Sequence, residues 1–206
     1  MGLRSGGNAT AQPAELTRRK TLCENTIRDI CARTVASTDG GGPAQNPRPT
    51  PALHFTERRG GYYRWKANRI EIGEKYLGEP SRTDDEIRAL IGHELGHWAD
   101  PDLVRACRLG GTALALTVPL GLAVMFSIVF SALGVALSMF AILTFVMCVL
   151  TPWASWGSEF YADQFAVRAV GSEAVVELLG SLGSRFPSPT HPSPARRVAH
   201  ARTARV

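Results

Sequence analysis

The chain has 206 residues and only four cysteines, and no two of them form a Cys-x-x-Cys pair. They stand far apart in the sequence, at Cys23, Cys31, Cys107 and Cys148. A thiolate zinc finger needs such pairs, and a small disulfide-stapled domain needs a denser set of cysteines. The sequence therefore favours neither class, and we interpret the four cysteines as reduced, structural residues.

Charge is also missing from a long segment, because no Asp, Glu, Lys or Arg occurs from Leu109 to Ser158. About 20 uncharged, mostly apolar residues suffice to cross a bilayer, and residues 112–150 are roughly twice that length. We predict a transmembrane hairpin at 109–152, with a tight turn near Ser131–Gly134. A pair of buried helices in a soluble bundle is the alternative, although such helices usually show a polar face.

The first 50 residues lack an apolar run, so we expect no signal peptide there. Residues 1–12 contain Gly, Ser and Asn and are predicted to be disordered. Residues 13–36 carry apolar side chains at helical spacing with charged residues between them, which predicts an amphipathic helix. Residues 37–51 hold many Gly and Pro residues and are interpreted as a linker.

Residues 52–108 are expected to hold a small β-hairpin followed by a helix. Aromatic and β-branched residues favour a short strand at 52–56, a turn around Gly60–Gly61 and a longer strand through Ile72.

The helix that follows has clear start and stop signals. Thr83 is the expected N-cap, and Glu86 stands three residues later, so the two can form a capping box. Asp84 and Asp85 suit the positive end of the helix dipole. We expect the helix to end at Asp100–Pro101.

That helix carries His93 and His97 at positions i and i+4, with Glu94 directly after the first histidine. Two imidazoles at this spacing share one helix face and can bind the same Zn²⁺. Glu94 can reach a water held by that metal, so the pattern H-E-x-x-H is typical of metallopeptidases. Two plainer interpretations stay open, namely a pair of solvent-facing histidines and a structural zinc site, although structural sites favour cysteine.

A catalytic zinc site needs a third protein ligand and one open position. The candidates are the remaining histidines and the later carboxylates: His54, His191, His200, Asp100, Asp102, Glu159, Asp163, Glu173 and Glu177. Asp100 and Asp102 are too close in sequence to His97 to fold back over its helix face. We select Glu159, because a hairpin of two membrane passes returns the chain to the side it left and so brings Glu159 to the histidines.

We expect residues 52–108 to form the first part of a catalytic domain and residues 153–206 to form its second part. A helix is predicted over 158–170, where Asp163 stands four residues after Glu159 and so on the same face. There it could accept the free N–H of a ligating histidine, while a solvated helix face is the plainer alternative. A short helix follows, and the tail from Ser184 is rich in Pro, Ser and Arg.

The segments HELGH (93–97), EFYAD (159–163) and THP (190–192), in this order, resemble the HtpX and CaaX prenyl protease family of membrane zinc endopeptidases. The resemblance covers roughly residues 53–200. In HtpX a pair of membrane helices lies between the first two motifs. The implied fold is a zincin-like metallopeptidase domain, mainly α with a small β-hairpin or sheet, interrupted by a two-helix transmembrane hairpin.

The resemblance implies roles for the histidines and carboxylates of the first two motifs. His93, His97 and Glu159 would bind one catalytic Zn²⁺, and Glu94 would act as the general base. Asp163 would be the aspartate that supports the ligands from the later helix.

The third motif adds an implied oxyanion-stabilising role for His191, with Arg196 or Arg197 bracing the site. We assign that arginine to Arg196. Two features depart from the family, since the N-terminal membrane helices of HtpX are absent from this sequence and the catalytic domain is short.

Charges beside the uncharged segment predict its orientation. Arg105 and Arg108 precede it, Arg168 follows it, and both flanking parts of the chain hold more Lys and Arg than Asp and Glu. Positive charge prefers the cytoplasmic side, so we expect a multi-pass protein of the cell membrane whose active site faces the cytoplasm.

The leading hypothesis is therefore a membrane-bound zinc endopeptidase that acts on membrane-associated or misfolded proteins. The expected partners are a protein or peptide substrate and the lipid bilayer, and the oligomeric state is not predicted. A catalytically inactive membrane adaptor with a zinc fold is the alternative, although such a scaffold has no need of Glu94. Binding to nucleic acid is not expected, because nothing beyond the net charge of +5 suggests it.

Overall fold

The residues that the computed structural model describes are 13–36, 49–100, 121, 156–182 and 191–204. The predicted membrane hairpin at 109–152 lies outside them except for residue 121, and so do the N-terminal residues 1–12. Among the described helices, none is both long enough and apolar enough to cross a membrane.

Three short strands form a mixed sheet in the order β1-β3-β2. β1 (Ala52–Thr56) runs parallel to β3 (Arg69–Gly73), and β2 (Gly61–Arg64) runs antiparallel to β3. The single long strand predicted through Ile72 is instead divided by a turn at 65–68. Asn68 permits this turn with a φ of 44°, because Asn tolerates the left-handed region. Because β2 pairs only with β3, it is an edge strand of the described sheet.

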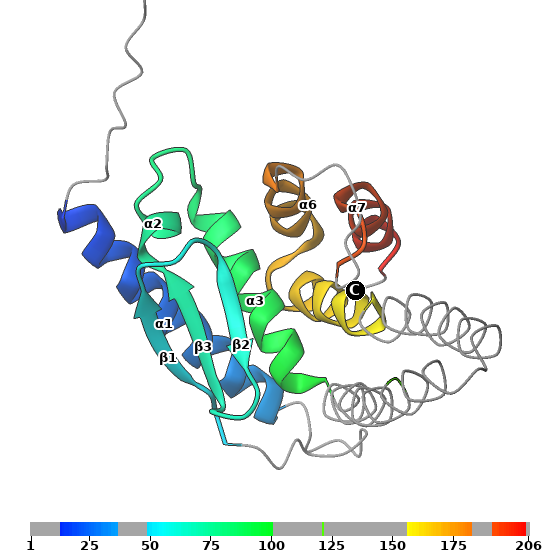
Figure 1. Ribbon diagram of the computed structural model, residues 1–206, viewed down its shortest axis with the longest axis horizontal. Coiled ribbons are helices and arrows are strands. Elements are labelled where there is room, and N and C mark those ends of the chain that lie inside the picture. The colour runs from blue at the N-terminus through cyan, green and yellow to red at the C-terminus, as the bar shows by residue number, and fades with distance from the viewer. Residues whose placement is uncertain (1–12, 37–48, 101–120, 122–155, 183–190, 205–206) are drawn as a thin grey trace, which may run out of the picture.

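One face of the sheet packs against α1 (Pro13–Ala36) and α3 (Asp84–Ala99), as Figure 1 shows with α1 behind the sheet and α3 beside β2. The shared core is built largely from isoleucines: Ile27, Ile30, Ile70, Ile72, Ile87 and Ile91. Cys23 and Cys31 are buried in the same core and are not disulfide-bonded. For these two cysteines, the predicted structural role is confirmed.

The start of α3 has the capping box expected from the sequence. Thr83 Oγ1 accepts a hydrogen bond from the Glu86 backbone N–H at 3.1 Å, and Glu86 Oε2 accepts one from the Thr83 N–H at 3.0 Å. Both bonds satisfy backbone donors that the first helical turn leaves unpaired. These two hydrogen bonds therefore fix the direction in which α3 leaves the preceding loop.

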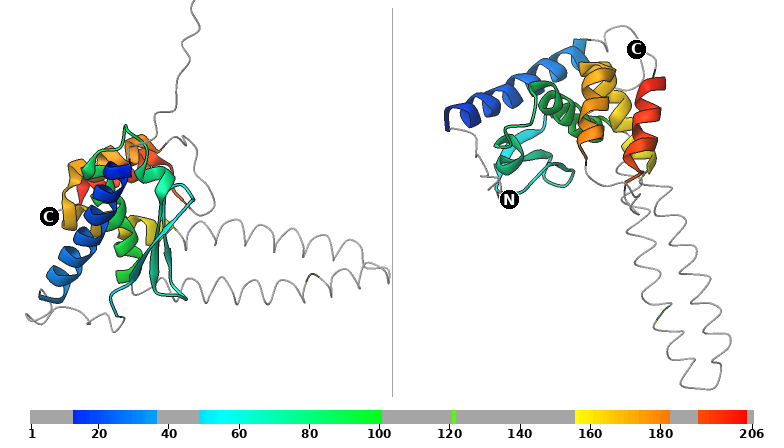
Figure 2. Two further views of the ribbon diagram at one scale, coloured as in Figure 1. Left: turned by 90° about the vertical axis from the view of Figure 1, so that its left-hand side faces the viewer. Right: turned by 90° about the horizontal axis from the view of Figure 1, so that it is seen from above.

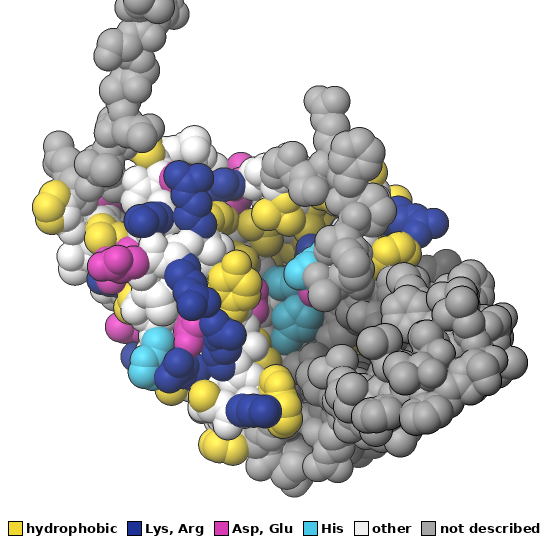
Figure 3. All heavy atoms as spheres, in the orientation of Figure 1, with side chains coloured by type: hydrophobic (Ala, Val, Ile, Leu, Met, Phe, Trp, Pro, Cys, Tyr) yellow, Lys and Arg dark blue, Asp and Glu magenta, His cyan; other side chains and the backbone are white. Residues whose placement is uncertain are grey.

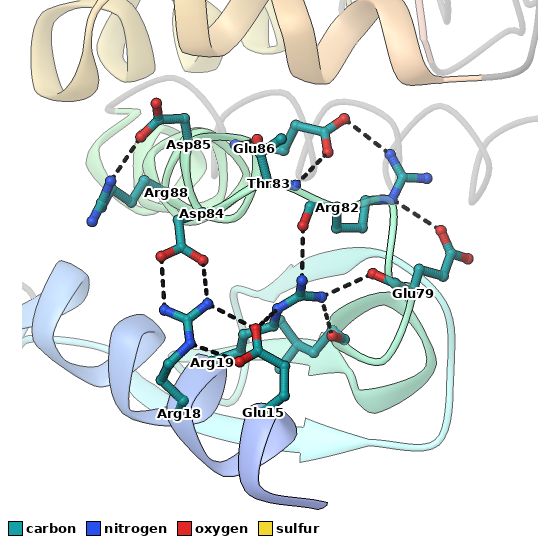
Figure 4. Close-up of polar contacts among 11 residues, drawn as sticks. Glu15, Arg18, Arg19, Glu79, Arg82, Thr83, Asp84, Asp85, Glu86 and Arg88 are labelled. Carbon is teal, nitrogen blue, oxygen red and sulfur yellow. Dashed lines mark hydrogen bonds and ion pairs between the residues drawn. The ribbon is translucent and has the colours of Figure 1, made fainter. Parts of the chain in front are cut away.

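Arg19 of α1 holds that preceding loop in place (Figure 4). Its buried guanidinium donates to the backbone carbonyls of Leu77, Glu79 and Arg82 at 2.6, 2.9 and 2.9 Å. Arg18 beside it is exposed and pairs with Asp84 at 2.7 Å. α1 thus positions the segment between α2 (Glu74–Leu77) and α3.

α3 crosses a second helix, over residues 156–170, at very short range. A Cβ placed on Gly96 would lie 2.5 Å from the Cα of Ala162, and one placed on Gly92 would lie 3.2 Å from the Cα of Ala166. Both alanines are fully buried. Glycine on one helix and alanine on the other therefore let the two backbones touch.

Two further helices cover this crossing. α6 (Ser172–Ser181) packs against α3, and α7 (Pro194–Thr203) packs against α6, as the views of Figure 2 also show. α7 lies in the tail that the sequence analysis left without structure. Ser193 followed by Pro194 at the first helical position is the signal that could have predicted it.

We expect Arg19→Met to destabilise the fold by about 3 kcal/mol, because three backbone carbonyls, one buried and two partly buried, lose a charged donor. Arg18→Met, one residue away on the exposed side, should cause a much smaller change. Urea unfolding of both variants measures the difference. Similar losses at the two positions would contradict the role given to Arg19.

The helix crossing is tested by Gly96→Ala, whose new methyl group would meet backbone atoms of Ala162 that cannot move independently. We expect a loss of at least about 2 kcal/mol from overpacking. Gly180→Ala is the control, because Gly180 is an exposed helical residue with open space around it, and there alanine should stabilise by up to about 1 kcal/mol. Thermal unfolding of both variants distinguishes a steric clash at Gly96 from the general effect of replacing a helical glycine with alanine.

Candidate metal centre

His93 and His97 project from α3 toward the helix over 156–170. Their rings meet edge to face, with centroids 4.7 Å apart and planes at 81°. Glu159 reaches them from the second helix, with Oε2 3.6 Å from His93 Nε2 and Oε1 3.4 Å from His97 Nε2. The predicted third ligand therefore lies beside the two histidines.

These three side chains have the spacing of a single coordination sphere. One ligand atom from each lies within 4.8 Å of the others. Ligands at about 2.0–2.1 Å from a tetrahedral Zn²⁺ lie roughly 3.4 Å apart, close to the separations between Glu159 and the two histidines. The donor set of two imidazoles and one carboxylate is also one that catalytic zinc sites use.

An unsatisfied buried atom supports the same conclusion. Glu159 Oε2 is buried and accepts no hydrogen bond within the described part of the chain. Arg197 Nη1 lies 3.2 Å away and forms an ion pair, but without hydrogen-bond geometry. A buried carboxylate oxygen without a donor is costly, so the arrangement fits a cation at this position.

The other ring nitrogen of each histidine is held by a neighbour. His93 Nδ1 lies 3.0 Å from Asp163 Oδ1, and His97 Nδ1 lies 3.1 Å from Ser158 Oγ. With the proton on Nδ1, each ring donates to its oxygen partner and turns the Nε2 lone pair toward the metal position. Asp163 thus lies where the sequence placed it. No motif in the sequence pointed to Ser158.

Arg197, rather than Arg196, lies against Asp163. Its Nε and Nη2 donate to the two carboxylate oxygens of Asp163 at 2.8 and 2.7 Å, and its side chain is buried. Arg196 instead lies over the Trp156 ring, 5.6 Å from its centroid. Arg196 was the arginine that we expected to brace the site, and this choice is corrected to Arg197. Adjacent helical residues face different directions, and the register of α7, which the sequence analysis lacked, turns Arg197 inward.

The buried acids of the site are held in the charged form. Burial would raise the pKa of Glu159, but the hydrogen bond with His97 and the charges of His93 and Arg197 lower it to about 2. Burial would also raise the pKa of Asp163, but hydrogen bonds from Arg197 and His93 lower it to about 2. The site therefore presents carboxylates rather than carboxylic acids to a cation.

Glu94 and His191 lie on two sides of this group. Glu94 is buried against β2, where a Cβ placed on Gly61 would be 3.0 Å from Glu94 Oε1. His191 Nε2 lies 3.4 Å from Glu159 Oε1, and 57% of the His191 side chain is exposed. Figure 3 shows histidine side chains in a hollow of the surface. The site thus has a buried side with Glu94 and an open side with His191.

The remaining histidines are used elsewhere. His54 lies on β1, in register with Glu71 of β3. His200 contacts the Phe160 ring, with centroids 4.7 Å apart, and Gln164 at 2.8 Å. Within the described residues, neither belongs to the group that could hold a metal.

Comparison with known proteins identifies a family for the chain. A sequence model described as peptidase family M48 matches residues 66–205, which is more than half of the chain. No curated protein and no solved structure matches the chain. The matched region contains every residue of the site described above.

We expect the purified protein to bind one Zn²⁺, and His93→Ala, His97→Ala and Glu159→Ala each to remove most of that zinc. Asp163→Asn should weaken zinc affinity by about 10- to 100-fold, because the acceptor that orients His93 loses its negative charge. His200→Ala is the control and should keep full zinc content. Elemental analysis and competition with a chelator measure both effects, and equal zinc content in all five variants would contradict the ligand set.

Proposed function

The chain belongs to peptidase family M48, whose members are zinc metalloproteases, and from this premise we propose that it is a membrane-bound zinc endopeptidase of the HtpX type. Its substrates would be peptide bonds of membrane-associated or misfolded proteins. The observation that carries the proposal is the approach of His93, His97 and Glu159 to within 4.8 Å of one another, with Glu94 directly after His93 on the same helix.

In this proposal His93, His97 and Glu159 hold the zinc, which when bound acidifies a water and polarises the scissile carbonyl. Glu94 accepts a proton from the attacking water and later delivers it to the leaving amine. The Glu94 carboxylate suits this role because it is buried beside the ligands but is not one of them.

His191 is proposed to assist from the open side of the site. A ring N–H near Glu159 could donate to the carbonyl oxygen of the substrate as negative charge develops there, and such donors stabilise transition states for acyl transfer. Arg197 takes the bracing role that the resemblance implied for an arginine, since it holds Asp163, which in turn holds His93.

The substrate is proposed to bind as an added strand on β2. Strand addition uses the unpaired backbone groups of a sheet edge, and β2 pairs only with β3 in the described sheet. Gly61 brings this edge against Glu94. An extended peptide on β2 would therefore pass close to the zinc ligands.

The membrane part of the proposal is supported by the sequence. The uncharged segment between Leu109 and Ser158 is long enough for two passes, and basic residues on both of its sides favour a cytoplasmic site. The order of the motifs, with this segment between them, favours HtpX over CaaX prenyl proteases as the nearer type. The proposed location is thus the cell membrane, where the substrates would also lie.

Glu94→Gln should abolish cleavage of casein by the detergent-solubilised protein, with a loss of at least about 10³-fold, because the amide cannot accept the proton. Zinc content should stay unchanged. Glu177→Gln is the matched control, since Glu177 is exposed on α6, and it should keep full activity. Equal casein cleavage by Glu94→Gln and the native protein would reject the peptidase and leave a binding protein as the explanation.

A further inference from the structure

The free edge of β2 has two chemically different sides. Side chains alternate between the faces of a strand. Gly61 faces Glu94, and Tyr63 on the same side is half-buried and packs against the core. Tyr62 and Arg64 point to the opposite face and are exposed, Tyr62 by 49% and the Arg64 side chain by 44%.

A peptide strand paired with β2 would place every second side chain beside Tyr62 and Arg64. Directly opposed residues of paired strands have their Cβ atoms about 4.5–5.5 Å apart, which is within reach of a guanidinium. Arg64 shares this face with Tyr62, since its guanidinium carbon lies 5.9 Å from the centroid of the Tyr62 ring. The peptide residue opposite Arg64 is therefore the one whose charge would interact with the Arg64 guanidinium.

Arg64 is only partly neutralised. Its Nε pairs with Glu71 Oε2 at 3.1 Å, but Glu71 Oε1 also pairs with Arg69 Nη2 at 2.6 Å. Hydrogen bonds from Arg69 and Arg64 lower the pKa of Glu71, so it is charged. Two guanidiniums on one carboxylate leave an excess of one positive charge on this face.

The surroundings add to that excess. The exposed charged residues in the turns beside β2 are mostly basic: Glu57, Arg58, Arg59 and Lys66. Figure 3 shows Lys and Arg side chains gathered on this face around an acidic one. A carboxylate on a bound peptide would meet a net positive field here, whereas a lysine or arginine would be repelled.

We propose that Arg64 makes the enzyme selective for substrates with an Asp or Glu at the position that pairs with Arg64. This inference rests on the proposed function and names the substrate class of the same site. The recognising interaction is a charge-assisted hydrogen bond between the guanidinium of Arg64 and the substrate carboxylate.

The test uses the full-length protein in detergent and casein as the first substrate. Mass spectrometry identifies the cleaved bonds, and a peptide spanning one of them is then made with Glu, Gln or Lys at each flanking position in turn. We expect one position at which Lys in place of Glu lowers kcat/KM by about tenfold. At that position Arg64→Glu should reverse the preference, and Arg64→Gln should remove it.

Arg69→Glu is the matched control. Arg69 pairs with the same Glu71, has nearly the same exposure (41% against 44%), and lies opposite Arg64 in the register, but on the central strand. It should weaken the preference for Glu without reversing it, because Arg69 shares Glu71 with Arg64 but does not lie on the free edge strand. An equal change in Arg69→Glu, or cleavage without preference at every position, would overturn the inference and leave the peptidase standing. Cleavage that does not depend on Glu94 would instead overturn the proposed function and this inference with it.

Discussion

The close crossing of α3 with the helix over 156–170 is the contact on which the site depends. A zinc ligand set drawn from two helices requires their side chains to meet within a few ångströms of one ion. Gly92 and Gly96 permit this because they alternate along α3 with His93 and His97, and they face Ala162 and Ala166. On the second helix, the alanines alternate in the same way with Glu159 and Asp163. Small residues thus set the distance between the two backbones. At that distance the Glu159 side chain is long enough to reach His93 and His97.

Charge balance explains why so many ionisable groups are buried at this crossing. Glu94, Glu159 and Asp163 are buried carboxylates, and Arg197 is the buried cation that faces them in the described part of the site. With neutral histidines the group carries two negative charges in excess, which a divalent ion would neutralise. Burial alone would lower the pKa of His93, yet Asp163 and Glu159 raise it. The site therefore attracts positive charge, either as protons or as a metal ion.

The sequence predicted those parts of the fold and site that follow from local spacing. The capping box of Thr83 and Glu86 and the shared face of His93 and His97 depend on residues within one or two helical turns. Glu159 could be selected from afar because the metal requires a third ligand. The pairing of β1 with β3 could not be predicted, since it joins strands that are not consecutive in the chain and depends on the turn at Asn68. The choice between Arg196 and Arg197 also failed, because it depends on the register of α7 against Asp163. The contact of Ser158 with His97 could not be predicted either, because many surface residues carry a hydroxyl group and nothing in the sequence distinguishes this one.

One hydrogen bond joins described residues on either side of the uncharged segment. Tyr161 OH donates to the backbone carbonyl of Ala99 at 3.4 Å, so residues that precede and follow the segment are neighbours. A chain that leaves and returns at neighbouring points must cross a bilayer an even number of times if it crosses at all. The length of the segment is about that of two passes. α3 and the helix over 156–170 are in direct contact through Gly96 and Ala162, so His93, His97 and Glu159 come together within the described part of the chain.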